Sequence, residues 1–207
     1  MKDSQKTPRI TRSRLVFEQL EDKRVLATLT VSSDSDSGVV DPDDGIVTLR
    51  EAIQYVNKDY LLTGVEADAQ TFSYLDLGTN DKIVFANGIS SIQLSYNEAL
   101  IIKNSVVIAG PGWDQLTIDA SMLPNNSDSV YGNGKQVFGI EITTDEAVTI
   151  RDLAITGGDA GEGCGIGTRN LAPDLGTSVT LERLHVYGNQ AKNAGGGIYS
   201  ALAISPL

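Results

Sequence analysis

Few residues of this sequence have the chemistry of a catalytic or metal-binding centre. There is one histidine, His185, and one cysteine, Cys164. A Ser-His-Asp triad or a multi-histidine metal site would therefore depend on His185 alone, while a single thiol excludes an intramolecular disulfide and a cysteine-based zinc site. His185 lies between Leu184 and Val186, which we expect to point inward, so we predict that it faces outward beside Tyr187, and spacing gives it no carboxylate or thiol partner. Cys164 stands between two glycines, which predicts a small residue at a tight corner.

Charged residues recur at matching positions of two similar ten-residue segments. Alignment of the segments places Arg151 over Glu182 and Asp152 over Arg183. If the segments are neighbouring parallel strands, about 4.8 Å apart, these outward side chains form two crossed ion pairs. The alternative is catalytic, because polysaccharide lyases use an arginine and a carboxylate on an outer face. We favour the structural interpretation, since exposed ion pairs are common and contribute only about 0–1 kcal/mol.

Two groups of carboxylates are candidates for calcium. Five aspartates fall within residues 34–45, but the spacing and glutamate partner of a calcium-binding loop are missing. We therefore predict a solvated loop there, with calcium as the alternative. Asp159, Glu162 and Asp174 lie between the aligned segments and are weaker candidates for calcium or a sugar. The sequence assigns no catalytic, cofactor-binding or metal-binding residue, and no cofactor is predicted.

Composition and charge restrict the function classes. The chain has 207 residues, of which 41% are hydrophobic, so it is long enough to bury a core. The net charge is −11, and residues 1–27 contribute +3 from seven basic and four acidic side chains, which leaves −14 for the rest. An acidic body without a basic stripe disfavours nucleic-acid binding. No apolar run approaches the roughly 18–20 residues of a membrane helix, so no transmembrane helix is expected.

One helix is predicted from Leu49 to Val56, after a short strand at 28–33 and the acidic loop. Thr48 and Glu51 have the spacing of a capping box, in which each side chain bonds the backbone amide of the other residue. The apolar residues of the helix fall on one face: Leu49, Ala52, Ile53 and Val56. Arg50 and Glu51 together suggest a catalytic pair, but capping and a surface ion pair explain them better.

Residues 1–27 begin with basic side chains but lack the apolar core of ~7–15 residues that a standard signal peptide needs. Composition predicts a disordered tail that ends in a short helix over 14–27. The strings Phe17-Glu18-Gln19-Leu20-Glu21-Asp22 and Arg24-Val25-Leu26-Ala27 resemble the LEPR-XLL segment of large bacterial surface and secreted proteins, with Lys23 in place of the usual arginine. The resemblance implies a sorting or export role.

The segment that contains the predicted helix, Gly45 to Asn57, is similar to the CSLREA motif of bacterial surface proteins. Leu49-Arg50-Glu51-Ala52 is intact, while Val47 and Thr48 stand where the family has cysteine and serine. The threonine keeps the helix cap, so the thiol is not indispensable for it. The resemblance implies that a right-handed parallel β-helix follows this element.

The body of the chain contains a repeat. Residues 148–157 align with 179–188 at an offset of 31, and 163–166 align with 195–198 at an offset of 32. We align 100–110 as an earlier, looser copy, and Leu116–Ile118 and 138–142 supply further alternating pairs. Each unit reads as two short strands with a kink, then a turn and a glycine-rich corner, and stacked units would bury a continuous apolar column.

A parallel β-helix fits these units better than an antiparallel sandwich, because hairpin signals such as Asn-Gly do not join them. We therefore predict an all-β, pectin-lyase-like fold with three parts: an export segment at 1–27, a cap region at 28–82 and β-helix coils at 83–207. Residues 188–199 resemble the repeats of polymorphic outer membrane proteins. The apolar, uncharged stretch after Lys192 predicts an incomplete last coil that self-associates.

These features favour a non-catalytic secreted or cell-surface protein of bacteria, an adhesin or structural stalk, or a fragment of a longer protein. Its expected partners are polysaccharides, other surface proteins or further copies of itself. The alternative is a polysaccharide lyase or hydrolase on the same scaffold. A groove with three or more converging acids would favour that alternative, because lyases bind calcium through such acids.

Overall fold

The computed structural model describes residues 28–36, 44–57, 81–96, 98–123, 135–142, 146–171 and 177–202. Over these residues the chain is mostly β-strand, with a single helix, α1 (Leu49–Asn57). None of the described helical structure is long and apolar enough to cross a membrane. The chain is therefore of the all-β class in the part that the structure describes.

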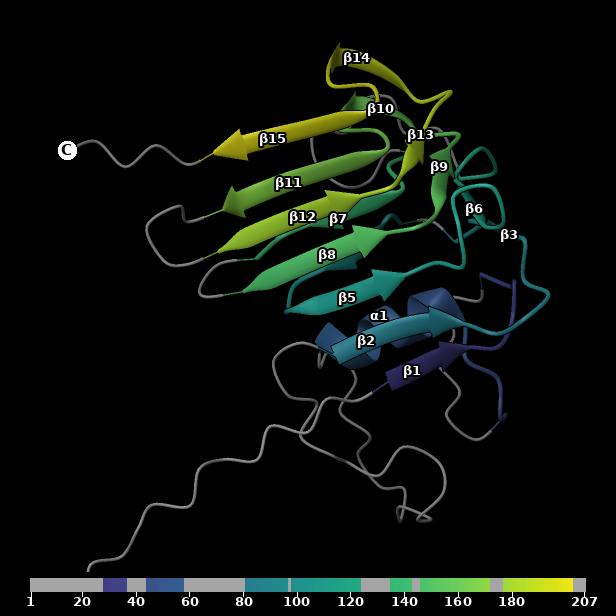
Figure 1. Cartoon of the computed structure of the whole chain (residues 1–207). Coiled ribbons are helices and arrows are strands. Elements are labelled where there is room, and N and C mark those ends of the chain that lie inside the picture. Colours follow the sequence, from purple (N-terminus) through teal and green to yellow (C-terminus); the bar gives the residue numbers. More distant parts are fainter. Residues whose placement is uncertain are drawn as a thin grey trace, which may run out of the picture.

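The strands assemble into parallel sheets, in which every neighbouring pair of named strands runs in the same direction (Figure 1). The first sheet contains, in spatial order, β1 (Thr28–Val31), β2 (Asp81–Phe85), β5 (Val106–Ala109), β8 (Ala147–Arg151) and β12 (Ser178–Glu182). The second contains β3 (Ser91–Gln93), β6 (Thr117–Asp119), β9 (Ala154–Thr156) and β13 (His185–Val186). The third contains β4 (Leu100–Ile102), β7 (Phe138–Ile140), β11 (Ile166–Leu171) and β15 (Ile198–Leu202). A two-stranded sheet pairs β10 (Asp159–Glu162) with β14 (Gln190–Ala194).

The chain visits the three large sheets in rotation, and we call each such passage a coil. Coil one is β2 to β4, coil two is β5 to β7, coil three is β8 to β11 and coil four is β12 to β15. Side chains that alternate toward the inside form one buried apolar cluster along the stack. Each coil thus rests on the previous one, which is how a short unit buries an apolar face that it cannot bury alone.

The register of the strands confirms the repeat. Val148 pairs with Val179 at the offset of 31, and Ile166 pairs with Ile198 at the offset of 32. The looser copy at 100–110 is wrong in phase, because Leu100 pairs with Phe138 in the third sheet while the strand that pairs with Val148 begins only at Val106. That stretch joins the end of one coil to the start of the next, and alternating apolar residues look alike in both.

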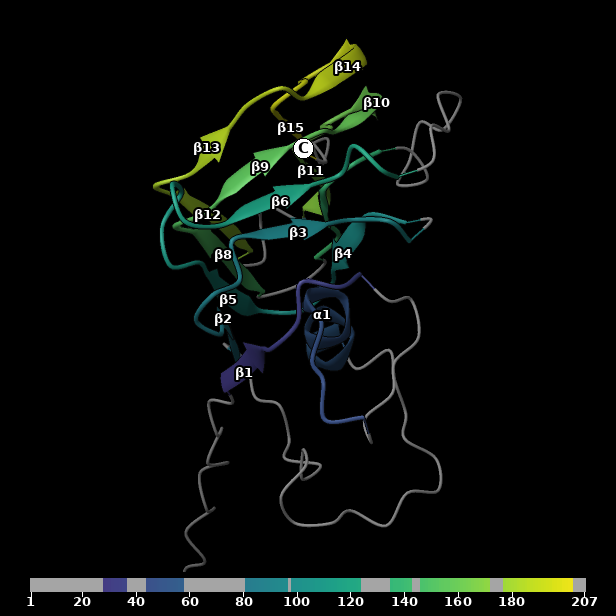
Figure 2. The same cartoon turned by 90° about the vertical axis from the view of Figure 1, so that its right-hand side faces the viewer.

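The helix covers one end of the stack. Leu49, Ala52, Ile53 and Val56 are buried, as predicted, and α1 packs against β1, β2 and β4. Figure 2 shows α1 below β3 and β4, at the opposite end from β13 and β14. Both capping-box bonds are present, since the Thr48 amide donates to Glu51 Oε2 at 2.7 Å and the Glu51 amide donates to Thr48 Oγ1 at 3.2 Å.

The start of the sheet structure differs from the sequence prediction. The predicted strand at 28–33 is present as β1, but it extends the first sheet beside β2, which begins at Asp81 rather than Ile83. The Asp81 side chain is buried, and a polar residue at a strand start gives no alternation signal. The predicted export segment, 1–27, and most of the linker, 58–80, lie outside the described residues.

Candidate functional site

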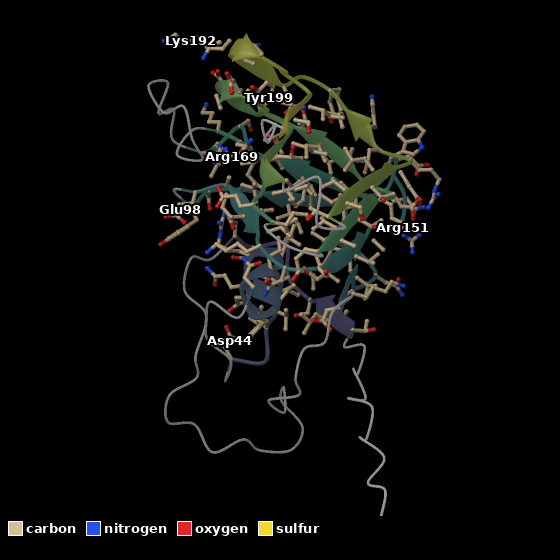
Figure 3. The ribbon with its side chains drawn as sticks, turned by 90° about the vertical axis from the view of Figure 1, so that its left-hand side faces the viewer. Asp44, Glu98, Arg151, Arg169, Lys192 and Tyr199 are labelled. Carbon is tan, nitrogen blue, oxygen red and sulfur yellow. The ribbon has the colours of Figure 1, made fainter. Side chains whose placement is uncertain are left out.

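The predicted charged cluster lies at the corner where the chain leaves the first sheet for the second. Arg151 and Glu182 end β8 and β12 and are paired in register. Asp152 and Arg183 follow them with φ angles of 59° and 48°, so both residues adopt the left-handed conformation. This conformation bends the chain between the two strands of each unit and explains the kink in the repeat. Figure 3 shows Arg151 on the opposite side of the stack from Arg169.

One of the two expected ion pairs is present and the other has different partners. Arg183 donates two hydrogen bonds to the carboxylate of Asp152, from Nε to Oδ1 at 2.5 Å and from Nη2 to Oδ2 at 2.8 Å. The expected pair between Arg151 and Glu182 is wrong: Arg151 bonds Asp152 at 2.9 Å, and Glu182 contacts Arg183 at 3.3 Å. The left-handed turn brings the carboxylate of Asp152 within reach of both guanidinium groups, and this competes with the in-register partner.

The electrostatics of this corner favour the charged carboxylate. The hydrogen bond from Arg183 holds the pKa of Asp152 below its ordinary value, and the same bond raises the pKa of Arg183. A carboxylate that two guanidinium groups hold in the ionised form is a weak proton acceptor. The arrangement suits a bridge between coils better than a general base.

An exposed group of aromatic rings, the aromatic corner, lies beside the second sheet and consists of Trp113, His185 and Tyr187. His185 is exposed, as predicted, and stacks on Tyr187 with ring centroids 4.5 Å apart. It pairs in register with Ala154, also as predicted, and its ring meets Trp113 edge to face at 5.4 Å. The sequence alone did not place Trp113 here, because that residue is two coils away from the others.

Arg50 belongs to the helix cap, but its ion pair is buried rather than on the surface. Its Nε donates to Asp36 Oδ1 at 2.7 Å and its Nη2 to Oδ2 at 3.1 Å, with the two side chains 5% and 1% exposed. The guanidinium also donates to the carbonyls of Glu98 and Ala99 and lies 5.2 Å from the centre of the Tyr96 ring. Arg50 therefore fastens α1 to the chain before β4, and the surface interpretation was wrong.

Asp36 is an exception to the predicted solvated acidic loop, because it is buried while the other described residues of that loop are exposed. Its Oδ2 accepts the amides of Ser95 and Tyr96 at 2.8 and 2.9 Å in addition to Arg50. Burial raises the pKa of Asp36, but these hydrogen bonds and the charge of Arg50 outweigh it and hold the pKa below its ordinary value. Only 34–36 and 44–45 of this loop are described, and no three His, Cys, Asp or Glu residues gather there or elsewhere in the described chain.

The remaining candidates occupy corners of coil three. Cys164 is fully buried between β10 and β11, beside Gly163 with its φ of 61°, and burial raises the pKa of its thiol. Asp159 and Glu162 bound β10, while Asp174 lies outside the described residues. These positions agree with a tight corner around Cys164.

Two polar side chains that the sequence did not indicate hold the coils together. Asn189 Oδ1 accepts a hydrogen bond from the Gly158 amide at 2.8 Å, and its Nδ2 donates to the carbonyls of Ile155 and Tyr187. Gln136 is buried and donates to the carbonyl of Gly163 at 2.6 Å. The Gly188-Asn189 step soon after β13 is a turn signal that could have indicated the first, but nothing in the sequence marks the second.

The described residues thus bring together a charge-balanced corner and an exposed aromatic surface, both on the outside of the coils. The corner can bridge neighbouring coils, and the aromatic surface can pack against an external apolar face. Comparisons with protein-family models, curated proteins and solved structures return no match for this chain.

Proposed function

We propose that this chain is a non-catalytic secreted or cell-surface protein, an adhesin or structural stalk, built on a right-handed parallel β-helix. The rotation of the strands through three parallel sheets, with offsets of 31 and 32 residues, supports the helix. The handedness follows the strong preference of parallel crossover connections. The resemblance of 17–27 and 45–57 to the LEPR-XLL and CSLREA segments supports export and a surface location.

The observation that carries the proposal is the way in which the charged groups are used. Arg50 and Asp36 fasten the helix to the stack, and Asp152 and Arg183 join coil three to coil four. The second pair belongs to the outer-face corner that the lyase alternative would use, and there the arginine and the carboxylate are bonded to each other. Their engagement with each other favours a structural role, in which the ion pairs join neighbouring elements of the stack.

Coil four supplies the surface for self-association in this proposal. Its inward side chains are only partly buried, and Ile198 is 49% exposed although its register partner Ile166 is fully buried. Exposed strand edges with apolar side chains are templates for pairing with another chain. A second copy of the chain would cover this surface.

Light scattering after size-exclusion chromatography tests the association. The chain is expected to show a mass that rises with concentration, and Ile198→Lys is expected to return it to the monomer mass. Ile46→Lys is the matched control, because Ile46 is 47% exposed near the helix-covered end. A concentration-independent monomer, or equal effects of both variants, would contradict association through coil four.

The enzymatic alternative is tested by product analysis. Incubation of the chain with pectin, alginate or hyaluronan is expected to release neither unsaturated nor reducing ends. Release that is abolished by Arg151→Ala would establish the lyase or hydrolase instead of the scaffold.

A further inference from the structure

The aromatic corner presents more exposed ring surface than the packing of the coils requires. Trp113 is 52% exposed and Tyr187 is 43% exposed, and the ring of His185 lies between them in the contact network. Contiguous apolar surface on the outside of a protein marks an interaction site more often than scattered single residues do. The ion pairs of the neighbouring corner do not use these rings.

The turn that carries Trp113 is tied to the charged corner. The Gly112 amide donates to the carbonyl of Asp152 at 2.9 Å, and the Gly112 carbonyl accepts the amides of Gln115 and Leu116 at 3.0 Å. Asp152 in turn holds Arg183 of the next coil. Coils two, three and four therefore meet at this place. Backbone hydrogen bonds fix the turn that carries Trp113.

The backbone that carries the other two rings is bonded to coil three. The amide of His185 donates to the carbonyl of Leu153 at 3.2 Å, and the amide of Tyr187 donates to the carbonyl of Ile155 at 3.0 Å. Both side chains point away from the core because they alternate with the partly buried Val186. A surface that is already ordered loses little conformational freedom when it binds.

We propose that the aromatic corner binds a neutral polysaccharide. The C–H bonds of a pyranose ring carry partial positive charge and pack against the negative face of an aromatic ring. Trp113 and Tyr187 keep about half of their surface exposed and so offer ring surface for this contact. Sugar hydroxyls both donate and accept hydrogen bonds, and the adjacent corner offers guanidinium groups and carboxylates of equal number, namely Arg151, Arg183, Asp152 and Glu182.

Charge selects the class of sugar. The corner itself is balanced, and the chain after residue 27 carries −14, since the total is −11 and the first 27 residues contribute +3. A polyuronate or a sulfated glycan would meet a like-charged body, which lowers its local concentration and its rate of association. A neutral chain of pyranose units meets no such opposition.

This inference rests on the proposed function, because it names the partner that a displayed scaffold would hold. The two fail separately. A chain that binds glycan but cleaves it would overturn only the scaffold, and a chain that associates through coil four but ignores glycans would overturn only the aromatic corner.

Tryptophan fluorescence reads this surface directly, since Trp113 is the single tryptophan of the sequence. The full chain is titrated with cellohexaose, xylohexaose and mannohexaose, and separately with hexagalacturonate as the anionic comparison. We expect a saturable shift of emission with at least one neutral oligosaccharide and a much weaker response to hexagalacturonate. The Tyr187→Ala variant is expected to raise the dissociation constant at least about tenfold, because a single aromatic anchor often contributes that much.

Two variants separate binding from folding. Tyr187→Phe keeps the ring and is expected to bind as the parent does, and Met122→Ala removes a side chain that is 66% exposed outside the aromatic corner and is expected to change nothing. Equal melting temperatures show that the variants are folded. The proposal is overturned if none of the neutral oligosaccharides shifts the emission, if Tyr187→Ala binds like the parent, or if hexagalacturonate binds as tightly as they do.

Discussion

The helix-covered end of the stack and coil four bury the same kind of apolar residue to different depths. At the covered end, the apolar face of α1 closes over β1, β2 and β4, and side chains such as Leu49 and Ile83 are at most 1% exposed. In coil four, Val179 and Leu181 stand in register with the buried Val148 and Ile150 but are only partly buried. Coils three and four have similar sequences here, so the difference in burial arises from the neighbours that cover each coil.

The two ends also differ in how they treat charge. Arg50 and Asp36 are buried together and reach four backbone groups besides each other. Arg183 and Asp152 make a similar fork near coil four, but the arginine is 57% exposed there. A buried arginine–aspartate pair fixes a helix in place, whereas an exposed pair competes with water and contributes little.

The largest expected effect on stability comes from breaking the buried ion pair between Arg50 and Asp36. Arg50→Ala should lower the free energy of unfolding by about 3–5 kcal/mol, because it leaves the carboxylate of Asp36 buried without its cation. Urea denaturation followed by circular dichroism measures this. Replacing both partners, as Asp36→Leu with Arg50→Met, should recover most of the loss, and failure to recover would mean that the carbonyl contacts of Arg50 matter more than the pair.

The next effect compares identical residues in register. Val148→Ala should cost about 2 kcal/mol, from lost burial and the cavity that remains in a fully packed layer. Val179→Ala should cost less than half as much, because that side chain is already partly in water. Equal losses in urea denaturation would show that coil four is as well covered as coil three.

A smaller effect is expected at the helix cap. Thr48→Ala should cost about 1 kcal/mol, since the amide of Glu51 loses its acceptor at a buried helix start. Thr48→Ser keeps the hydroxyl and is the control. Differential scanning calorimetry distinguishes the two variants, and equal melting temperatures would mean that the Thr48 cap does not stabilise the helix.

The smallest expected effect is on the acid dependence of stability, through the exposed ion pair between Arg183 and Asp152. The pKa of Asp152 is lowered in the folded chain, first by the hydrogen bond from Arg183, so its contribution to stability is present above the unfolded value of about 4 and is lost as the pH falls through the folded value. Asp152→Asn should therefore flatten the pH dependence of unfolding slightly in that acidic range. A steeper acid dependence in the variant would reverse the sign of this argument.

Local sequence determined much of the fold. The capping-box spacing of Thr48 and Glu51 and the apolar face of the next two turns were sufficient to predict α1, because a helix start depends on residues within four positions. The offsets of 31 and 32 residues predicted which strands pair, since parallel coils place like residues over like. The outward direction of His185 followed from simple alternation along its strand.

Only the tertiary structure decided which distant side chains meet. Arg50 pairs with Asp36 across a loop and Trp113 joins His185 across two coils, and no periodic pattern encodes either contact. At the left-handed turns of Asp152 and Arg183 one expected ion pair is replaced by another, because the backbone conformation at a corner decides which neighbour a side chain reaches. Pairing along the strands is local and repeated, whereas contacts at corners depend on the path of the whole chain.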